Sequence, residues 1–203
     1  MDLIISFLQI LRLPLRFLSH PDDTMSKKND DRKDIVIVGG GIAGVLAAKA
    51  LSAKLDHTRF NLILVDARTS FVHIIAGARM VVTSDGNLEN EAVVPFDRMF
   101  PKGKGAHVLG TVTEIQETAP GKGGDLVLSN GEKIHYDALV LATGSKWSGA
   151  MYFSHDVDEL RTTVKDWRNK FSVANHIVIA GGGPSGIGKC CQFSTIKYHE
   201  SHH

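Results

Sequence analysis

Four short apolar runs divide the chain, and each ends in an acidic residue or leads closely into glycine. They lie at residues 34–38, 60–66, 136–142 and 176–180. Continuous apolar runs of this length are typical of strands buried on both faces of a parallel sheet. Helical patterns occupy residues 42–55 and 156–171, and the second has one apolar stripe that contains Val157, Leu160, Val164 and Trp167. The alternation predicts an α/β fold.

A different pattern, of period two, lies between the second and third runs. An antiparallel three-stranded meander is predicted by alternating positions at 110–116, 125–129 and 133–136. The pair Asn130-Gly131 is typical of a two-residue hairpin turn. We expect this ribbon to cover one face of the parallel sheet, after a separate short strand at 106–109. Residues 94–101, which are bracketed by prolines, predict a loop with a short helix.

The first apolar run leads into glycines at G-x-G-x-x-G spacing, namely Gly39, Gly41 and Gly44. A strand, this turn and a following helix form the arrangement that holds a dinucleotide pyrophosphate on a helix N-terminus. Gly39 permits the tight turn, Gly41 lets the backbone approach the phosphates, and Gly44 lets the helix lie close to the strand. Asp66 ends the next strand at about the expected 20-residue spacing, so it is the candidate ribose ligand. A βαβ unit with an acidic turn and no ligand is the alternative.

Three further positions follow from the same pattern. Thr143 and Gly144 form a turn after the third run, at the strand end where open α/β sheets bind ligands. Arg68 follows the ribose acid and could approach the adenosine end of a dinucleotide, while a solvated loop arginine fits the spacing equally well. His73 has no partner motif, so we interpret it as structural.

The fourth apolar run ends in the same glycine spacing, at Gly181, Gly183 and Gly186, which predicts a second dinucleotide turn. The residues beyond it continue the pattern poorly. Gly188 costs a helix about 1 kcal/mol relative to alanine, and no amphipathic stripe, further strand or ribose acid follows. We therefore expect a damaged helix and an aberrant tail at 188–203.

Composition narrows the classes of function. The 203 residues suffice for one domain and part of another, and a net charge of +1 gives no basic field for nucleic acid. The neighbouring Cys190 and Cys191 cannot bridge each other without strain, which is typical of a reduced intracellular protein. Their spacing to His199 and His202 matches no recognised zinc site, so no metal is expected. No apolar run reaches the roughly 20 residues that span a bilayer.

Residues 1–33 differ from the rest of the chain. The run 3–18 is apolar with two arginines, and 19–33 has the composition of a solvated linker. Three interpretations of residues 1–24 stay open: an interfacial membrane helix, an organelle-targeting segment, and an extension that precedes a natural start at Met25. The expected location is cytoplasmic, and membrane-associated and mitochondrial locations are the alternatives.

Three elements together carry a family resemblance. The first glycine turn, Asp66 and the motif Y-D-A-L-V-L-A-T-G-S (136–145) resemble the flavoproteins with two dinucleotide-binding domains, the pyridine nucleotide-disulphide oxidoreductases. Residues 71–82 and 94–101 are similar to the apoptosis-inducing-factor-like branch. That branch is in turn similar to the AMID-type oxidoreductases and the type II NADH:quinone dehydrogenases.

The resemblance implies a Rossmann-like FAD-binding domain at 34–150, with a parallel sheet and a β-meander insert, and the start of a Rossmann NAD(P)-binding domain at 151–187. It implies that a hydride passes from NAD(P)H to FAD and that electrons pass on to a quinone-like acceptor. Asp66 would take the ribose, where relatives often have Glu. By resemblance, the FAD positions are Gly39, Gly41, Ile42, Ala43 and Gly44 at the pyrophosphate, Arg68 near the adenosine, Val112 at the adenine, and Ala142, Thr143 and Gly144 along the middle of the cofactor. The NAD(P)H positions are Gly181, Gly183 and Gly186.

The chain departs from the family after Ile187, where relatives usually continue with Glu. The codons for Gly188-Lys189-Cys190 can contain a splice-donor sequence, so we expect 188–203 to be translated non-coding sequence and the chain to be C-terminally truncated. We therefore expect an FAD-adenosine half-site, absent or weak turnover, and no assigned catalytic residue. A non-catalytic dinucleotide-binding fragment or isoform is one alternative. A dehydrogenase with NAD at the first turn is another, and the motif at 136–145 argues against it.

Overall fold

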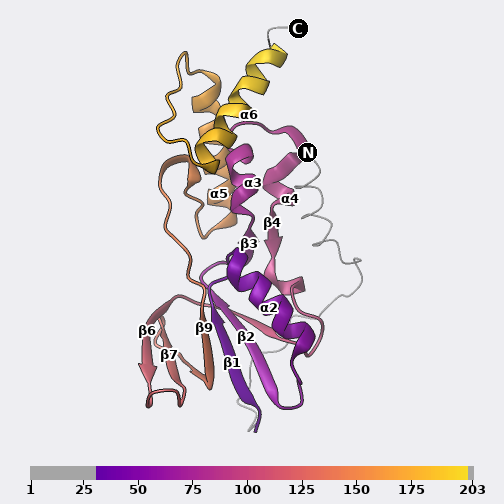
Figure 1. Cartoon of the computed structure of the whole chain (residues 1–203), viewed down its shortest axis with the longest axis vertical. Helices are drawn as coiled ribbons and strands as arrows, with labels where there is room; N and C mark the ends of the chain where they lie inside the picture. Colours follow the sequence, from indigo (N-terminus) through magenta and orange to yellow (C-terminus); the bar gives the residue numbers. More distant parts are fainter. Residues whose placement is uncertain (1–30, 201–203) are drawn as a thin grey trace. The chain divides into compact units, whose positions relative to one another are not determined.

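The computed structural model describes residues 31–200. The predictions for residues 1–30 and for His202 lie outside this part of the chain. Four parallel strands form a sheet in the order β5-β2-β1-β9 (Figure 1). Their bounds are Lys33–Val38 for β1, Phe60–Asp66 for β2, Ala106–Leu109 for β5 and Ala138–Leu141 for β9. The predicted α/β fold with a parallel sheet is confirmed.

The two central strands are buried on both faces, as their uninterrupted apolar sequences predict. Val36, Ile37, Leu64 and Val65 have no exposed surface. Strand β1 pairs with β2 on one side and with β9 on the other, both in parallel. Since parallel strands all end at the same edge, the first glycine turn, Asp66 and the residues after β9 lie at one edge of the sheet.

Helix α2 (Ile42–Lys54) covers one face of this sheet. Its buried residues include Val45 and Ala48, which pack in a cluster with Ile37, Leu64 and Phe96. The small side chains of the helix allow a close approach to the strands, as the alanine-rich sequence predicts. The helix thereby starts directly above the carboxyl end of β1.

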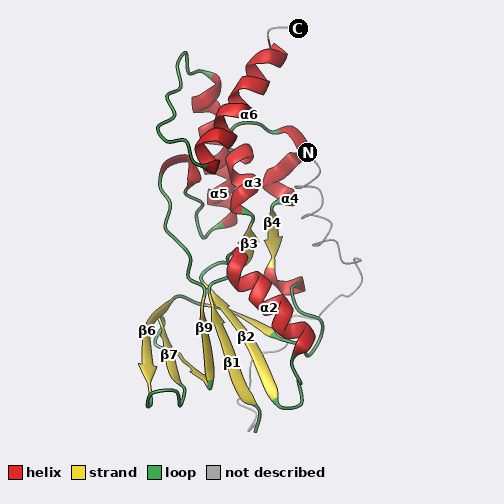
Figure 2. Cartoon of the chain, viewed as in Figure 1, coloured by secondary structure: helices red, strands yellow, loops and turns green. Residues whose placement is uncertain are grey.

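The antiparallel meander packs on the other face of the sheet, and its strands β6 and β7 lie beside β9 in Figure 2. It consists of β6 (Val112–Glu117), β7 (Gly124–Leu128) and β8 (Lys133–Tyr136). Leu126, Leu128 and Tyr136 pack with Val36 and Val65 of the parallel sheet. The prediction that this ribbon covers a sheet face is confirmed.

The turn between β7 and β8 differs from the prediction. The Leu128 carbonyl accepts from the Gly131 N–H at 2.9 Å, and the Leu128 N–H donates to the Glu132 carbonyl at 2.9 Å. The loop therefore contains three residues, 129–131, and not the two of an Asn-Gly hairpin. Gly131 has a φ of 84°, so the glycine takes the left-handed position that ends a three-residue loop. The Asn-Gly pair identified the turn correctly but not its length.

A third group of elements lies between β2 and β5 in the sequence, and α5 joins it from later in the chain. Short strands β3 (Ser70–Val72) and β4 (Val93–Pro95) pair antiparallel. Helix α5 (Val157–Ser172) buries Leu160 and Val164 in a cluster with Met80. The predicted stripe on α5 is confirmed, because Val157 and Trp167 also pack against this cluster. The remaining elements are α3 (Ile74–Met80), η1 (Asp85–Asn87), α4 (Leu88–Glu91), η2 (Phe96–Arg98) and η3 (Gly149–Met151).

Two expectations for the end of the chain are wrong. Residues 176–180 form no strand, and the side chain of Val178 is 91% exposed. Helix α6 runs unbroken from Pro184 to Glu200 through Gly188, where a damaged helix was expected. The cost of one glycine is small, about 1 kcal/mol, and Phe193 of α6 packs on Phe171 of α5 with ring centroids 4.9 Å apart. The coding origin of residues 188–203 stays a prediction.

Candidate dinucleotide-binding site

The first glycine turn contains two positions at which a side chain has no space. Gly39 has a φ of +105°, and a Cβ atom there would lie 2.3 Å from the Ala142 carbonyl oxygen. A Cβ atom on Gly44 would lie 1.8 Å from the Gly39 carbonyl oxygen. The Gly39 N–H donates to the Val65 carbonyl at 2.8 Å. These glycines let β1, β9 and α2 meet at one point, as the motif predicts for a tight turn with close helix packing.

The two central glycines of the turn have opposite surroundings. Gly40 is buried, and a Cβ atom there would lie 2.3 Å from Cζ of Phe96. Gly41 has no atom within 4 Å of its Cβ position. Gly41 is also the N-cap of α2, no side chain caps this helix, and its first turn holds no acidic residue. An uncapped helix N-terminus with open space before it has the geometry of an anion site, to which Ile42 and Ala43 contribute the first helical turn.

Asp66 joins the end of β2 to the glycine turn. Its Oδ2 atom accepts from the Gly40 N–H at 2.5 Å, and its Oδ1 atom accepts from the Arg68 N–H at 2.8 Å. Each carboxylate oxygen has a second lone pair, so two hydroxyl groups of a ribose could still bind. The structure thus brings Asp66 and the first glycine turn together, as predicted for a ribose ligand beside a pyrophosphate site.

Two aromatic residues of the site were missed by sequence reasoning. Phe96 of η2 packs on Gly40 and stacks on His107 of β5, with ring centroids 4.7 Å apart. Burial lowers the pKa of His107, while the charge of Asp66 and the backbone carbonyl of Arg68 oppose that shift. No periodicity marks Phe96, and its only sequence signal is its position after Pro95 in the proline-bracketed segment.

The guanidinium of Arg68 binds the backbone of a distant segment. Its Nη2 atom donates to the Phe153 carbonyl at 2.9 Å, in the segment that precedes α5. Arg68 is therefore a loop arginine with a specific backbone partner, which differs from the solvated alternative. Its backbone N–H is still held by Asp66 at 2.8 Å, so the residue remains beside the candidate ribose ligand.

The remaining predicted positions are Ala142, Thr143, Gly144 and Val112. Ala142 continues β9 and donates its N–H to the Val38 carbonyl at 2.8 Å, so it contacts the first turn directly. Thr143 is exposed, and Gly144 has a φ of +69° with open space before it. Val112 begins β6 and packs with the meander cluster. The structure thus groups Ala142 with the glycine turn and places Val112 with the β-ribbon.

His73 has a structural role, as expected. It is buried, and its Nδ1 atom accepts from the Ala76 N–H at 3.2 Å, which caps α3. Burial lowers the pKa of His73, and this favours the neutral ring that such a cap requires.

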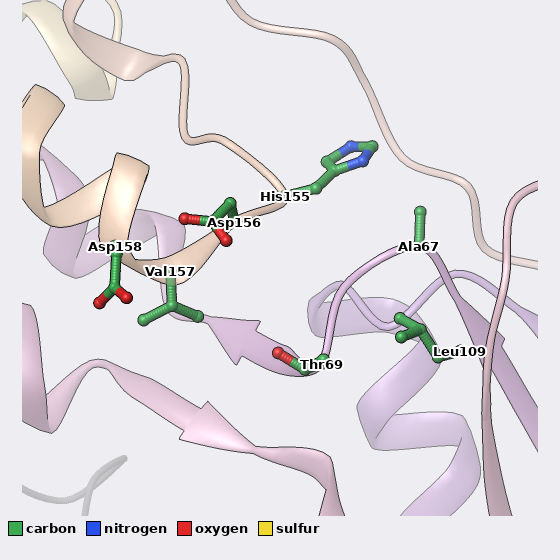
Figure 3. Close-up of a pocket in the computed structure, with 7 residues that line it drawn as sticks. All are labelled: Ala67, Thr69, Leu109, His155, Asp156, Val157 and Asp158. Atoms are coloured by element: carbon green, nitrogen blue, oxygen red, sulfur yellow. The ribbon is translucent and has the colours of Figure 1, made fainter.

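A shallow open pocket of about 330 Å³ is lined in part by residues that follow Asp66 (Figure 3). Ala67, Thr69 and Leu109 line one side of it, and residues 155–158 line the other. Asp156 already accepts from the Glu159 N–H at 2.8 Å as the cap of α5. The Asp156 carboxylate in this pocket therefore already serves as the N-cap of α5.

The second glycine turn repeats the backbone of the first. Gly181 has a φ of +111°, and a Cβ atom on Gly186 would lie 2.2 Å from the Gly181 carbonyl oxygen. The space before Gly183 is open, and the Gly183 carbonyl accepts from the Ile187 N–H at 3.0 Å. The corresponding bond at the first turn joins the Gly41 carbonyl to the Val45 N–H at 2.9 Å. The local turn is present although the segment before it forms no strand.

Cys190 and Cys191 are both exposed on α6. Among the side chains that the structure describes, which do not include those of His199 and His202, no group of three or more His, Cys, Asp or Glu could hold a metal ion.

A family comparison assigns the chain. Residues 33–201 match the family described as Pyridine nucleotide-disulphide oxidoreductase. The match covers most of the sequence, and the protein belongs to this family. The family uses FAD and NAD(P)H.

Several oxidoreductases and apoptosis-inducing-factor homologues are similar to the chain in sequence. The chain is 42% identical to the FAD-dependent oxidoreductase FVFD30 of Flammulina velutipes over 108 residues, which are 53% of this chain and 33% of that protein. It is 30% identical to the apoptosis-inducing factor homolog B of Dictyostelium discoideum, over 75% of this chain and 36% of that protein. It is 30% identical to the ferroptosis suppressor protein 1 of Taeniopygia guttata, over 79% and 40%. The chain thus spans well under half the length of these relatives.

Solved structures share the fold. A NAD-dependent persulfide reductase from A. fulgidus matches with a TM-score of 0.57 and 18% identity, over 81% of this chain and 32% of that one. The structure of NDH2 from Plasmodium falciparum in complex with NADH matches with a TM-score of 0.54 and 17% identity, over 80% and 37%. At this level of identity the likeness establishes the fold.

Proposed function

We propose that the protein is an FAD-dependent oxidoreductase of the apoptosis-inducing-factor-like type, in which the first glycine turn holds the FAD pyrophosphate. One observation carries this proposal: Gly39 and Gly40 are packed against protein, whereas Gly41 faces open space at an uncapped helix start. A buried turn that ends in an open glycine leaves the N–H groups at the uncapped start of α2 free to meet phosphate oxygens. Asp66, next to it, has acceptor capacity left for the ribose.

The second turn is the proposed site of the nicotinamide nucleotide. Gly181, Gly183 and Gly186 repeat the backbone geometry of the first turn, which supports binding of a second pyrophosphate. FAD, when bound, would accept a hydride from NAD(P)H and pass electrons on to a quinone-like acceptor. The quinone-like acceptor is proposed from the resemblance to type II NADH:quinone dehydrogenases. The transfer from NAD(P)H through FAD to an acceptor is an activity of proteins much longer than the described segment.

Two matched glycine variants test the assignment of the first turn. Gly41 has a φ of −74° and an open Cβ position, so Gly41→Val should fold normally. The added side chain would occupy the space proposed for phosphate, and we expect FAD affinity to fall at least tenfold in isothermal titration. Gly183→Val has the same open position in the second turn, and it should weaken NADH binding while FAD binding persists. Equal FAD affinity in wild type and Gly41→Val would refute the proposal.

A non-catalytic dinucleotide-binding protein is the second candidate. The observation in its favour is the unpaired segment before the second turn, in which Val178 is 91% exposed. Without a sheet to orient that turn, a nicotinamide ring would have no fixed position against the flavin, and positioning is what hydride transfer requires. Protein that binds FAD but oxidises no NADH with a soluble quinone present would support this candidate. Chromatography of the nucleotide released by denaturation distinguishes FAD from NAD at the first turn.

Contact with a membrane surface is proposed for residues 3–18, whose apolar sequence contains Arg12 and Arg16. In the part of the chain that the structure covers, no helix is long and apolar enough to cross a membrane. Flotation with anionic liposomes, for residues 1–203 and for residues 25–203, tests the proposal. We expect the shorter chain to lose binding, and equal flotation of both would contradict membrane contact through this segment.

A further inference from the structure

We infer that Asp66 is a positioning residue that holds the glycine turn in its binding conformation, in addition to its candidate role as a ribose ligand. The inference rests on the proposed binding of a dinucleotide at that turn. In this role the Asp66 carboxylate acts through the Gly40 peptide. It thereby affects binding of the phosphate part of the ligand without a direct contact to the phosphates.

The hydrogen bonds of two consecutive residues at the end of β2 define the turn. The Val65 carbonyl accepts from the Gly39 N–H at 2.8 Å, and the Asp66 Oδ2 atom accepts from the Gly40 N–H at 2.5 Å. The first of these bonds uses backbone and is independent of the side chain at 66. The second exists only because the side chain of residue 66 is long enough to place an acceptor atom beside the Gly40 N–H.

Contacts on the other side of Gly40 prevent its peptide from adjusting freely. The Phe96 ring lies where a Cβ atom of Gly40 would be, and that ring is itself stacked on His107. The Gly40 peptide is thus enclosed between an aromatic ring and a carboxylate. The next residue, Gly41, faces open space, so the orientation of the Gly40 peptide sets the direction in which the open part of the turn presents its backbone.

Only a carboxylate satisfies both amides around Asp66 at once. Oδ2 serves Gly40 and Oδ1 serves the Arg68 N–H at 2.8 Å. An asparagine has one acceptor oxygen and one NH₂ group, so it leaves one of these N–H groups facing a donor. Asp66→Asn, which is nearly equal in size, therefore breaks a bond that sets the turn or the loop beside it.

The test compares two ligands that differ only in the ribose hydroxyls, ADP and 2′,3′-dideoxy-ADP, on the full chain. If Asp66 acted through the ribose alone, Asp66→Asn would weaken ADP binding and leave dideoxy-ADP binding unchanged. We expect Asp66→Asn to weaken both ligands, dideoxy-ADP by about tenfold, since a hydrogen bond to a charged acceptor is lost. Unchanged dideoxy-ADP affinity would overturn the inference. Asp66→Glu keeps two acceptor oxygens and should recover part of the loss, and the absence of any recovery would also count against it.

Asp34→Asn is the matched control. Asp34 lies at the opposite end of the same strands, and its carboxylate accepts from the Asn61 side chain at 2.8 Å. Removing this charge should leave the affinity for both ligands unchanged. If Asp34→Asn lost as much affinity as Asp66→Asn, the loss would follow from removing any negative charge, and the inference would be overturned.

Amide exchange in the wild type tests the contact without any variant. The Gly40 amide should be protected in the ligand-free protein, as should the Gly110 amide, which donates to the Asp66 backbone carbonyl at 2.9 Å. Rapid exchange at Gly40 beside slow exchange at Gly110 would overturn the inference even if Asp66→Asn does not fold. Wild-type protein that binds neither ADP nor FAD would refute the proposed function and this inference with it, and that failure is recognised before any variant is compared.

Discussion

Phe96 and Gly40 are in such close contact that a Cβ atom on Gly40 would lie 2.3 Å from Cζ of the ring. The two residues are far apart in the sequence, and η2 brings Phe96 against the first glycine turn. The ring cannot move away easily, because it is buried and stacks on His107. The middle glycine of the G-G-G run is therefore required by packing, whereas its neighbour Gly41 remains open.

Replacing Gly40 by alanine should destabilise the fold through this contact. An added methyl group in a packed core costs about 1 to 3 kcal/mol, so we expect the free energy of unfolding to fall by about that amount. Urea denaturation followed by circular dichroism measures it. Gly41→Ala is the control, because its φ of −74° and open Cβ position allow alanine without strain. Equal stability of the two variants would show that Phe96 does not restrict Gly40.

The ion pair between Arg168 and Glu89 should be the strongest electrostatic contribution to packing α5 against α4. The guanidinium makes bonds of 2.9 and 2.6 Å to the two carboxylate oxygens, and the side chains are only 14% and 15% exposed. Arg168 also donates from Nε to the Met80 carbonyl at 2.6 Å. We expect Glu89→Gln to lower the free energy of unfolding by about 1 to 3 kcal/mol at pH 7.

The effect of Glu89→Gln should depend on pH. The hydrogen bonds from Arg168 lower the pKa of Glu89 below its usual value. A depressed carboxyl pKa contributes stability above the usual glutamate range, and that stability is lost as the pH falls through the lowered value. Wild type and variant should therefore converge in acid. A constant difference down to low pH would contradict this assignment. Asp158→Asn is the control, since its pair with Arg161 is exposed and should contribute less than about 1 kcal/mol.

His73 should make the protein sensitive to mild acid. Burial lowers the pKa of His73, so the unfolded chain takes up a proton at a higher pH than the folded chain does. Stability should consequently fall as the pH drops below about 6.5, the usual histidine value. His73→Asn keeps a side-chain acceptor for the cap of α3 but does not titrate in this range. We expect its free energy of unfolding to change less between pH 8 and pH 5.5 than that of the wild type, and identical pH slopes would refute the role of His73.

Gly188→Ala should stabilise α6. The position lies inside a helix, is only partly buried, and has no atom within 4 Å of its Cβ position. Alanine is favoured over glycine in a helix interior by up to about 1 kcal/mol. The gain is measured as slower amide exchange along α6. Gly131→Ala is the opposite case, because its φ of 84° disfavours any side chain, and it should destabilise the hairpin. A loss of exchange protection along α6 in Gly188→Ala would contradict a helix through this residue.

Some features followed from local sequence because their causes are local. The close approach of Gly44 to the Gly39 carbonyl lies within six residues, and Gly186 makes the same approach to the Gly181 carbonyl with no sheet beside it. The apolar runs of β1 and β2 and the stripe of α5 likewise identified their elements correctly. Backbone dihedral limits and side-chain periodicity act over a few residues, so a sequence displays them directly.

Other features depend on contacts between distant segments. Residues 176–180 have the sequence of a buried strand, yet they form none, because a strand requires a partner that satisfies its backbone groups. The stacking of Phe96 on His107 and its contact with Gly40 join three segments that no motif connects. The bond from Gly40 to Asp66 likewise exists only once β1 and β2 lie side by side. Hydrogen bonding and packing between remote residues are set by the fold, and they decide which atoms of a recognisable motif are enclosed and which stay open to a ligand.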